Sequence, residues 1–428
     1  MSFKFLKLLM IILDPRITKT PLRTMRELRK RGIKRMPEVF DKGGNSRIKA
    51  FKFLREWLSG EMLTNHKGKW VLNSFLPPFP GKAYERMFEN LLSGRRLSPV
   101  STFIAVTNSC PFNCPHCSIK GRPEGELSTD TWLKTINELH ELGNSMIGFT
   151  GGEPLMRKDL PELIKASVDG GAETIVFSSG AGFTPELAQS LKDAGLWAFC
   201  VSVESFDEEQ NSRMRNNPDA LSIARKALEL SVKMGFYTMI GSVARRSFVE
   251  SREYEKIYKV AREIGIDELR LVEPMPCGKL IDAVEDDLLS AEHIKALRKF
   301  HIETNRRGKL PKVCAFNHIE SPEMFGCGGG TQHMFIDYNG QVCPCDFTPM
   351  SFGCVEKQSL VEIWSRMSEA MHNPRRNCFV QKNHKIIQKH YRETGKLPLS
   401  PEISEKICKE AGTEPFPDYF KMVTGREK

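Results

Sequence analysis

The feature that most constrains the fold is a regular alternation of short apolar runs with amphipathic segments, which begins near residue 101. Segments with helical periodicity, such as Thr131–Leu142, Pro185–Ala194 and Ala220–Met234, separate the apolar runs. This alternation predicts parallel βαβ units, in which every strand ends at the same edge of the sheet. The loops after the strands carry the chemistry in α/β barrels. The predicted strands lie near 101–107, 145–150, 173–178, 197–203, 236–243 and 267–273.

Three closely spaced cysteines follow the first predicted strand. Cys110, Cys114 and Cys117 lie in the run Asn108-Ser-Cys-Pro-Phe-Asn-Cys-Pro-His-Cys-Ser118, with the spacing C-x3-C-x2-C. Three thiolates can hold a [4Fe–4S] cluster and leave one iron open to a small molecule, because such a cluster takes four ligands. A zinc site is the alternative, but it needs a fourth cysteine nearby, and none occurs before Cys200. The spacing therefore favours the cluster.

A glycine-rich run follows the second predicted strand. In Gly151-Gly-Glu-Pro154, the two glycines let the backbone approach a ligand closely, and Glu153 offers an acceptor for a ligand ammonium group. Alone, the run would be an ordinary turn closed by proline. Together with the cysteine triplet on the preceding strand, it resembles the radical S-adenosylmethionine (SAM) superfamily.

The resemblance implies an α/β fold with a partial (β/α)6 TIM-like barrel. It also implies that Cys110, Cys114 and Cys117 hold the cluster, whose open iron is chelated by the amino and carboxyl groups of SAM. Further positions are carried over from the family pattern. Those expected to bind SAM are Gly151, Gly152, Glu153 and Pro154 at the ammonium, Ser202 near the ribose or methionine end, His116 at the adenine, and Arg215 at the carboxylate, with Arg213 as its rival.

The remaining cysteines indicate a second metal site. The chain has 12 cysteines without a secretory signal, so metal ligands explain them better than disulfides. Several gather in a segment that begins at Cys327, where Asn339-Gly340 is a strong signal for a two-residue hairpin turn. The segment resembles the SPASM or twitch extension of radical SAM maturases, because Cys327, Gly340 and Cys345 match its core pattern.

That resemblance implies one auxiliary [4Fe–4S] cluster. The ligands we select are Cys327, Cys343, Cys345 and Cys378, with Cys354 and Cys314 in reserve. A structural zinc held by the same cysteines remains the alternative. Cys277, just after the sixth predicted strand, is a candidate catalytic residue, whereas Cys200 and Cys408 are expected to be ordinary buried thiols.

The first fifty residues carry an unusual charge. They contain 14 Lys and Arg against 4 Asp and Glu, a balance of +10 that equals the net charge of the whole chain. The apolar run 3–13 is too short to span a bilayer, which needs about 20 residues, and lacks a cleavage site for secretion. A basic amphipathic segment, Pro21–Met36, follows it. These features suit an anionic membrane surface; a helical cap over the barrel or a site for RNA phosphates are the alternatives.

The expected organisation is a basic helical N-terminal region (1–98), a radical SAM partial barrel (99–306), a small cysteine-rich SPASM/twitch-like extension (307–380) and a helical tail (381–428). The Pro-rich run 73–81 is interpreted as a linker. The predicted protein is a cytoplasmic oxidoreductase, peripheral on the inner face of the membrane if the basic segment binds there. A reductase, flavodoxin or ferredoxin would donate its electrons.

The expected reaction is reductive cleavage of SAM to a 5′-deoxyadenosyl radical, which abstracts hydrogen from an unactivated C–H bond of a large substrate. The extension favours a ribosomally made peptide as that substrate, to be modified or cross-linked. The basic segment favours the alternative of radical C–C or alkyl-chain chemistry on a membrane lipid. A non-catalytic iron–sulfur or zinc protein that binds RNA is the third interpretation. It leaves Gly151–Pro154 without a role, so nucleic acid is not expected as a partner.

Overall fold

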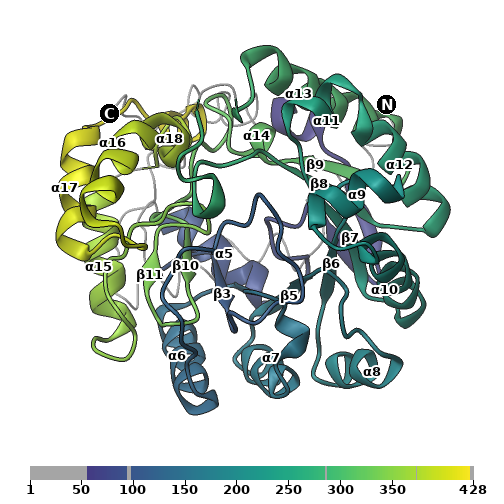
Figure 1. The fold of residues 1–428 in the computed structure, drawn as a ribbon, viewed down its shortest axis with the longest axis horizontal. Helices are drawn as coiled ribbons and strands as arrows, with labels where there is room; N and C mark the ends of the chain where they lie inside the picture. Colours follow the sequence, from purple (N-terminus) through teal and green to yellow (C-terminus); the bar gives the residue numbers. More distant parts are fainter. Residues whose placement is uncertain (1–54, 94–97, 285–286, 373, 425–428) are drawn as a thin grey trace.

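A nine-stranded sheet forms the centre of the molecule in the computed structural model, which describes residues 55–93, 98–284, 287–372 and 374–424. The strand order is β11-β10-β3-β4-β5-β6-β7-β8-β9, and only the β10–β11 pair is antiparallel. Figure 1 shows the strands as an arc with helices on its outer side. The strands are β3 (Ser101–Ala105), β4 (Met146–Thr150), β5 (Glu173–Ser178), β6 (Ala198–Ser202), β7 (Tyr237–Val243), β8 (Glu268–Val272), β9 (Lys312–Ala315), β10 (His333–Ile336) and β11 (Val342–Cys343).

Helices between successive strands cover the outer face of this sheet. They are α6 (Thr129–Leu142), α7 (Leu160–Asp169), α8 (Pro185–Asp193), α9 (Glu208–Arg215), α10 (Ala220–Met234), α11 (Arg246–Glu250), α12 (Glu253–Ile264) and α13 (Ala291–Arg307), with short 3-10 turns η1 (Pro154–Met156) and η2 (Gly278–Leu280). Outward-facing strand residues such as Phe149, Phe199 and Leu271 pack against the helices in the main core. Local signals set the helix ends: Ser128 caps α6 by accepting a hydrogen bond from the backbone N–H of Thr131.

The predicted fold class is confirmed, because the sheet is mostly parallel and its helices alternate with its strands. Each of the six predicted strands is present within about two residues of its expected ends. The predicted hairpin is also present, with Phe335 paired to Cys343 and Ile336 to Val342. Beyond the prediction, β10 pairs in parallel with β3, and β9 extends the opposite edge beside β8. Both additions come from the segment after 306.

The N-terminal part contains a short hairpin before the barrel begins. Strands β1 (Thr64–His66) and β2 (Lys69–Val71) pair in antiparallel fashion, and α5 (Lys82–Ser93) follows. The interpretation of 73–81 as a linker was wrong, because Asn73 and Ser74 are each only 1% exposed. The predicted basic segment 1–50 lies outside the described residues. Within the described residues, no helix is both long and apolar enough to cross a membrane.

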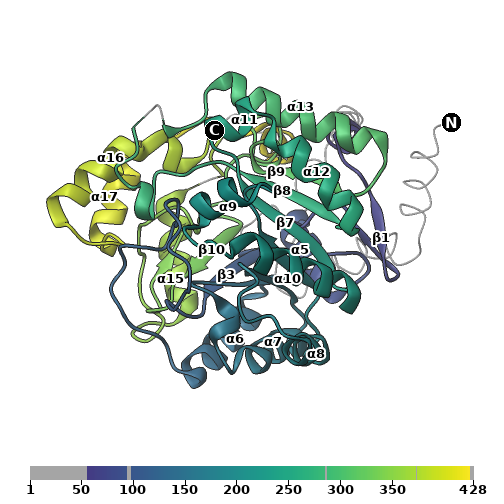
Figure 2. The same ribbon diagram turned by 45° about the vertical axis from the view of Figure 1, so that its right-hand side comes forward.

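The C-terminal part packs directly on the barrel. It comprises α14 (Phe316–Ile319), α15 (Leu360–Met371), α16 (Phe379–Thr394), α17 (Pro401–Ala411) and α18 (Asp418–Thr424). Helix α15 contacts both α6 and α17, and Figures 1 and 2 both show α15–α17 beside the edge formed by β10 and β11. The cysteine-rich segment is therefore built onto the first strand of the barrel.

Candidate active site

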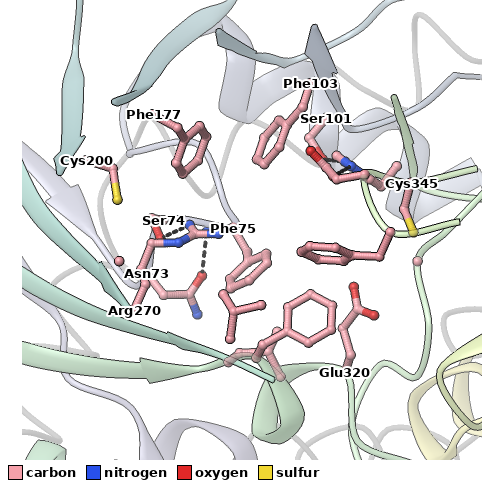
Figure 3. A pocket seen from close by; sticks show the side chains of 18 of the residues that line it. Asn73, Ser74, Phe75, Ser101, Phe103, Phe177, Cys200, Arg270, Glu320 and Cys345 are labelled. Carbon is pink, nitrogen blue, oxygen red and sulfur yellow. Dashed lines mark hydrogen bonds and ion pairs between the residues drawn. The ribbon is translucent and has the colours of Figure 1, made fainter. Parts of the chain in front are cut away.

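One cavity of about 1280 Å³ lies between the inner face of the sheet, the loops after its strands and the segment around Asn73–Phe75. Most of its lining side chains are apolar, and many are aromatic (Figure 3). Two groups of cysteines open into it: Cys110, Cys114 and Cys117 on the loop after β3, and Cys327, Cys345 and Cys378 from the C-terminal part. The site is therefore shared by the barrel and the cysteine-rich segment.

The glycine-rich run holds the first cysteine loop in place. The backbone N–H groups of Gly152 and Glu153 donate to the carbonyl oxygens of Thr107 and Ser109, at 2.7 Å each. A Cβ atom on Gly152 would overlap the Ser109 carbonyl, so this approach requires glycine. Burial raises the pKa of Cys110 to about 11, so iron binding there must release a proton. Three thiols that face one cavity are a donor set that fits a cluster with one open iron.

Glu153 lies behind the cavity wall. It is fully buried, and its carboxylate accepts hydrogen bonds from both hydroxyls of Ser178 and Ser179 and from the backbone N–H groups of Leu155 and Ser179. Burial is the largest influence on this carboxyl group and raises its pKa. Gly151, Gly152 and the two serines line the cavity, whereas Glu153 does not. Pro154 begins the turn η1.

A buried carboxylate that the sequence analysis did not select connects two of the expected SAM-binding positions. Glu204, 2% exposed, lies 3.4 Å from His116 Nε2 and 3.5 Å from Arg215 Nη1. Burial alone would raise its pKa, but the hydrogen bond with His116 and the charges of His116 and Arg215 outweigh burial and lower it. The sequence signal was its position, two residues after Ser202 at the end of a predicted strand.

The structure distinguishes Arg215 from its rival. Arg215 is 9% exposed, lines the cavity and lies over the ring of Phe112 at 5.4 Å. The side chain of Arg213 is 72% exposed and lies 3.7 Å from Glu209 of the same helix. Ser202 ends β6 and also lines the cavity. Arg215, Ser202 and His116 thus gather around the first cysteine loop.

The second cysteine group contains three of the four selected residues. Cys327 and Cys378 form a hydrogen bond with one another, and this bond, with the backbone N–H groups of Phe379 and Gly329, lowers the pKa of Cys327. The third, Cys345, lies close by: a Cβ on Gly329 would be 3.6 Å from Cys327 Sγ and 3.7 Å from Cys345 Cβ. The three thiols of Cys327, Cys345 and Cys378 therefore lie close together in the wall of the cavity.

Cys343 lies apart from this group. Its thiol accepts a hydrogen bond of 3.6 Å from Arg122, which also pairs with Asp337. It packs with Phe335 in a small core cluster and does not line the cavity. Strand alternation would place residues 343 and 345 on the same face, but β11 ends at Cys343, so Cys345 no longer follows the strand.

The other cysteines occupy separate positions. Cys354 lies 3.5 Å from the Asn339 carbonyl oxygen, and Cys314 is buried in β9, so neither lines the cavity. Cys277 is 2% exposed and does line it, near the first loop, where the Lys279 N–H donates to the Cys117 carbonyl. Cys408 is buried, as expected; Cys200 is buried too, but it lines the cavity (Figure 3).

A cluster of Glu61, His301 and His318 also has the composition of a metal site. All three are buried, and both Glu61 oxygens lack a hydrogen-bond partner in the described part of the chain. However, His301 Nδ1 accepts a hydrogen bond from the Ala315 N–H, so the neutral ring must carry its proton on Nε2. That atom faces Glu61 at 3.5 Å and has no lone pair to offer. We therefore assign no metal to this cluster.

Comparison with known proteins agrees with this arrangement. The sequence model of the radical SAM superfamily matches residues 104–255, and that of the SPASM iron–sulfur cluster-binding domain matches residues 327–389. A relative named AdoMet-dependent heme synthase, from Nitratidesulfovibrio vulgaris, is 28% identical over 63% of this chain and 80% of its own. A PqqA peptide cyclase from Granulibacter bethesdensis is 28% identical over 65% of this chain and 79% of its own.

Solved structures share the fold. Streptococcus suis SuiB bound to S-adenosylmethionine superposes with a TM-score of 0.52 at 15% identity, over 62% of this chain and 65% of SuiB. The enzyme anSMEcpe with bound AdoMet gives 0.50 at 18% identity, over 62% of this chain and 77% of its own. At these identities the likeness concerns the fold alone.

Residues 104–255 therefore form a radical SAM domain. The C-terminal part of the chain is an iron–sulfur cluster-binding domain of the SPASM type. These two domains identify an enzyme that uses SAM and [4Fe–4S] clusters.

Proposed function

We propose that this enzyme oxidises a bulky, mainly apolar substrate, which it encloses in the cavity that both cysteine groups line. The observation that carries the proposal is that shared cavity of about 1280 Å³. The cavity is larger than SAM alone requires, and its apolar lining favours a substrate that buries apolar surface there. Residues 99–306 would form the SAM-binding barrel, 307–380 the auxiliary domain, 381–428 the tail, and 1–98 the N-terminal region.

Cys110, Cys114 and Cys117 would hold the SAM-binding cluster. A reduced cluster there would supply one electron to SAM, whose S–C5′ bond breaks to give methionine and a 5′-deoxyadenosyl radical that takes a hydrogen atom from the substrate. The chain's own part is to bind, orient and exclude water. Gly151 and Gly152 would present backbone groups to the SAM ammonium, and Glu153 would keep Ser178 and Ser179 in place behind them.

Arg215, Ser202 and His116 would fix the rest of SAM. Arg215 is already oriented by Glu204 and by the Phe112 ring, so its remaining N–H groups can meet the SAM carboxylate. Glu204 also holds His116, the position expected at the adenine. Pro154 and Cys277 would shape the surroundings of this site without a direct chemical role.

Cys327, Cys345 and Cys378 would hold one auxiliary cluster. Bound there, it would offer a one-electron acceptor for the substrate radical, which would lose a proton at the same time. The net reaction is then a two-electron oxidation of the substrate, and a flavodoxin or ferredoxin supplies the electron for SAM cleavage. Cys343, selected from the sequence, would instead anchor Arg122 and β11.

A porphyrin-like macrocycle is the substrate class with the most support. Three relatives at 26–28% identity are named AdoMet-dependent heme synthase. A flat macrocycle buries much apolar surface and few backbone amides, which suits aromatic walls such as Phe75, Phe103 and Phe177.

A ribosomally made peptide is the second candidate, because the relative named PqqA peptide cyclase matches a similar share of this chain. An extended peptide would bring unpaired amides against the apolar lining, at a cost of about 1–3 kcal/mol for each unsatisfied group. A membrane lipid is the third, and its support is the basic segment 1–50 predicted from charge.

The test is turnover by the anaerobically reconstituted enzyme with SAM and dithionite. Adding an iron porphyrin with propionate side chains should raise 5′-deoxyadenosine several-fold above the uncoupled level and change the porphyrin's mass. The variant with Cys110, Cys114 and Cys117 all changed to Ala should form no 5′-deoxyadenosine. Stimulation by a peptide substrate in place of the porphyrin would select the second candidate, and turnover by the triple variant would overturn the assignment of the cluster.

A further inference from the structure

A buried arginine faces the same cavity at a distance from both cysteine groups. Arg270 lies in β8, is 6% exposed and lines the cavity (Figure 3). Its neighbours Leu269 and Leu271 pack into the outer core, so strand alternation directs Arg270 to the interior of the barrel. No step of the proposed function uses this side chain.

The charge of Arg270 has no direct counter-ion among the described residues. Its one hydrogen bond there goes from Nη1 to Ser74 Oγ, and no described carboxylate lies within 4.0 Å. Ser74 Oγ in turn donates to Glu268, so a neutral hydroxyl stands between Arg270 and the negative charge of Glu268. A guanidinium has five N–H donors, which leaves four without an acceptor. Burying a cation without a paired anion destabilises the folded protein, and a bound anionic ligand would offset that desolvation cost.

Aromatic rings hold the guanidinium head in place. Its Cζ lies 4.4 Å from the ring centroid of Phe75 and 5.2 Å from that of Phe177. Cation–π contacts of this kind orient the planar head and leave its edge free for hydrogen bonds. Figure 3 shows Arg270 beside Phe75, with Glu320 across the pocket. An anionic group would thus be drawn to the Arg270 side.

The register of the sheet relates Arg270 to the SAM site. Ser202 pairs with Gly241 of β7, and Gly241 pairs with Arg270 of β8. Two strand spacings of about 4.8 Å put the Cα atoms of Ser202 and Arg270 about 10 Å apart. Gly241 lines the cavity between them, and a Cβ there would lie 3.2 Å from Cys200 Sγ, so the wall at this point is formed by a small residue and a thiol. A substrate held at Arg270 can therefore extend to the first cysteine loop.

We propose that Arg270 binds a carboxylate group of the substrate, so that the substrate is an apolar molecule with an acidic side chain several bonds from its reacting carbon. The proposal rests on the proposed function for the identity of the cavity as the substrate site. A carboxylate matches the planar fork of arginine with two parallel hydrogen bonds. The propionate of a porphyrin has this chemistry, and so does the acidic side chain of a peptide.

The experiment measures binding without turnover. The reconstituted holoenzyme is titrated by calorimetry with 1-pyrenebutanoate and, separately, with its uncharged amide, which have the same apolar body. The wild-type protein should bind the acid roughly ten- to a hundredfold more tightly than the amide, because a charge-assisted pair is gained. Arg270→Gln should abolish that preference, and Arg270→Lys should keep part of it, because lysine retains the charge without the fork.

A matched control is Arg262→Gln, on the exposed surface of α12, which should keep the full preference. Equal binding of acid and amide by the wild-type protein would overturn the proposal, and so would an unchanged preference in Arg270→Gln. The comparison of acid and amide binding to the wild-type protein tests the proposal even if Arg270→Gln does not fold. SAM cleavage is assayed separately, so loss of cleavage with intact acid preference would refute the proposed function alone.

Discussion

At the scale of single residues, the candidate SAM site depends on two buried carboxylates, of which Glu204 lines the cavity and Glu153 lies behind its wall. Glu153 fixes two serines, and Glu204 holds His116 and Arg215 together. Both carboxylates are saturated by protein donors, so their main effect is to orient the groups that face the cavity. A side chain positioned in this way loses little freedom when the ligand arrives.

Arg215 provides the sharpest residue-scale prediction, because its rival lies two positions away. Arg215→Ala should weaken SAM binding roughly ten- to a hundredfold, since a charge-assisted pair with the carboxylate is lost. Arg213→Ala should bind SAM as the unaltered protein does, because that side chain is 72% exposed. Equilibrium dialysis of labelled SAM with both reconstituted variants measures this. The reverse order of effects would move the role to Arg213.

A substitution at Gly152 tests how the glycine-rich run supports the cysteine loop. Gly152→Ala should displace residues near Ser109 and reduce the iron held at the first cysteine group, because its Cβ would overlap a carbonyl oxygen. Gly81→Ala is the matched control, since a Cβ there meets its nearest atom at an ordinary 3.5 Å. Iron per chain and the yield of 5′-deoxyadenosine measure the effect. Full iron in Gly152→Ala would show that the loop can shift without loss.

At the scale of elements, the six barrel strands could be predicted because each is a continuous apolar run in the sequence. Helix ends could be predicted because the capping residues lie next to them in the chain. The parallel pairing of β10 with β3 could not be predicted, since 232 residues separate Ile104 from its partner Ile336 and no local sequence pattern indicates which strands pair. The burial of Ser74 was missed for the same reason: its partners Glu268 and Arg270 are almost two hundred residues away.

Strand alternation could have revealed Arg270, whereas it could not separate Cys343 from Cys345. In Glu268-Leu-Arg-Leu-Val272, the leucines alternate with two charged residues, which marks an inward-facing charge on a buried strand. The two cysteines differ because Cys343 lies within β11 and contacts Arg122, whereas Cys345 lies beyond the end of that strand. Motif spacing alone cannot separate these two cysteines.

The second cysteine group therefore gives an element-scale prediction. In the background with Cys110, Cys114 and Cys117 changed to Ala, the protein should keep about four irons and a [4Fe–4S] absorbance. Adding Cys345→Ala should lose most of that iron, because its thiol belongs to the group at Cys327 and Cys378. Adding Cys343→Ala is the matched control and should retain it. Equal loss from both would return Cys343 to the ligand set, and stoichiometric zinc in place of iron would support the structural-zinc alternative.

At the scale of the whole molecule, the cavity joins segments from the entire described chain. Asn73 comes from before the barrel, Arg270 from β8 and Cys378 from the start of α16. Substrate binding should therefore couple the barrel to the cysteine-rich segment. The strongly basic residues 1–50 lie outside the described residues, and their charge predicts a membrane contact that can be tested.

The intact protein should float with phosphatidylglycerol vesicles at low salt and not with neutral phosphatidylcholine vesicles. Each basic residue near an anionic surface contributes about 1 kcal/mol, and the attraction fades beyond a Debye length of about 10 Å at 0.1 M salt. Changing Arg23, Arg26, Arg29 and Arg31 to Gln should greatly reduce flotation, because it removes four of the 14 positive charges in this segment. Changing the same number of basic residues on the barrel surface, Lys192, Lys226, Arg262 and Lys295, controls for net charge and should leave flotation intact. If the unaltered protein stays at the bottom at low salt, the basic segment does not bind membranes, and the lipid candidate loses its support.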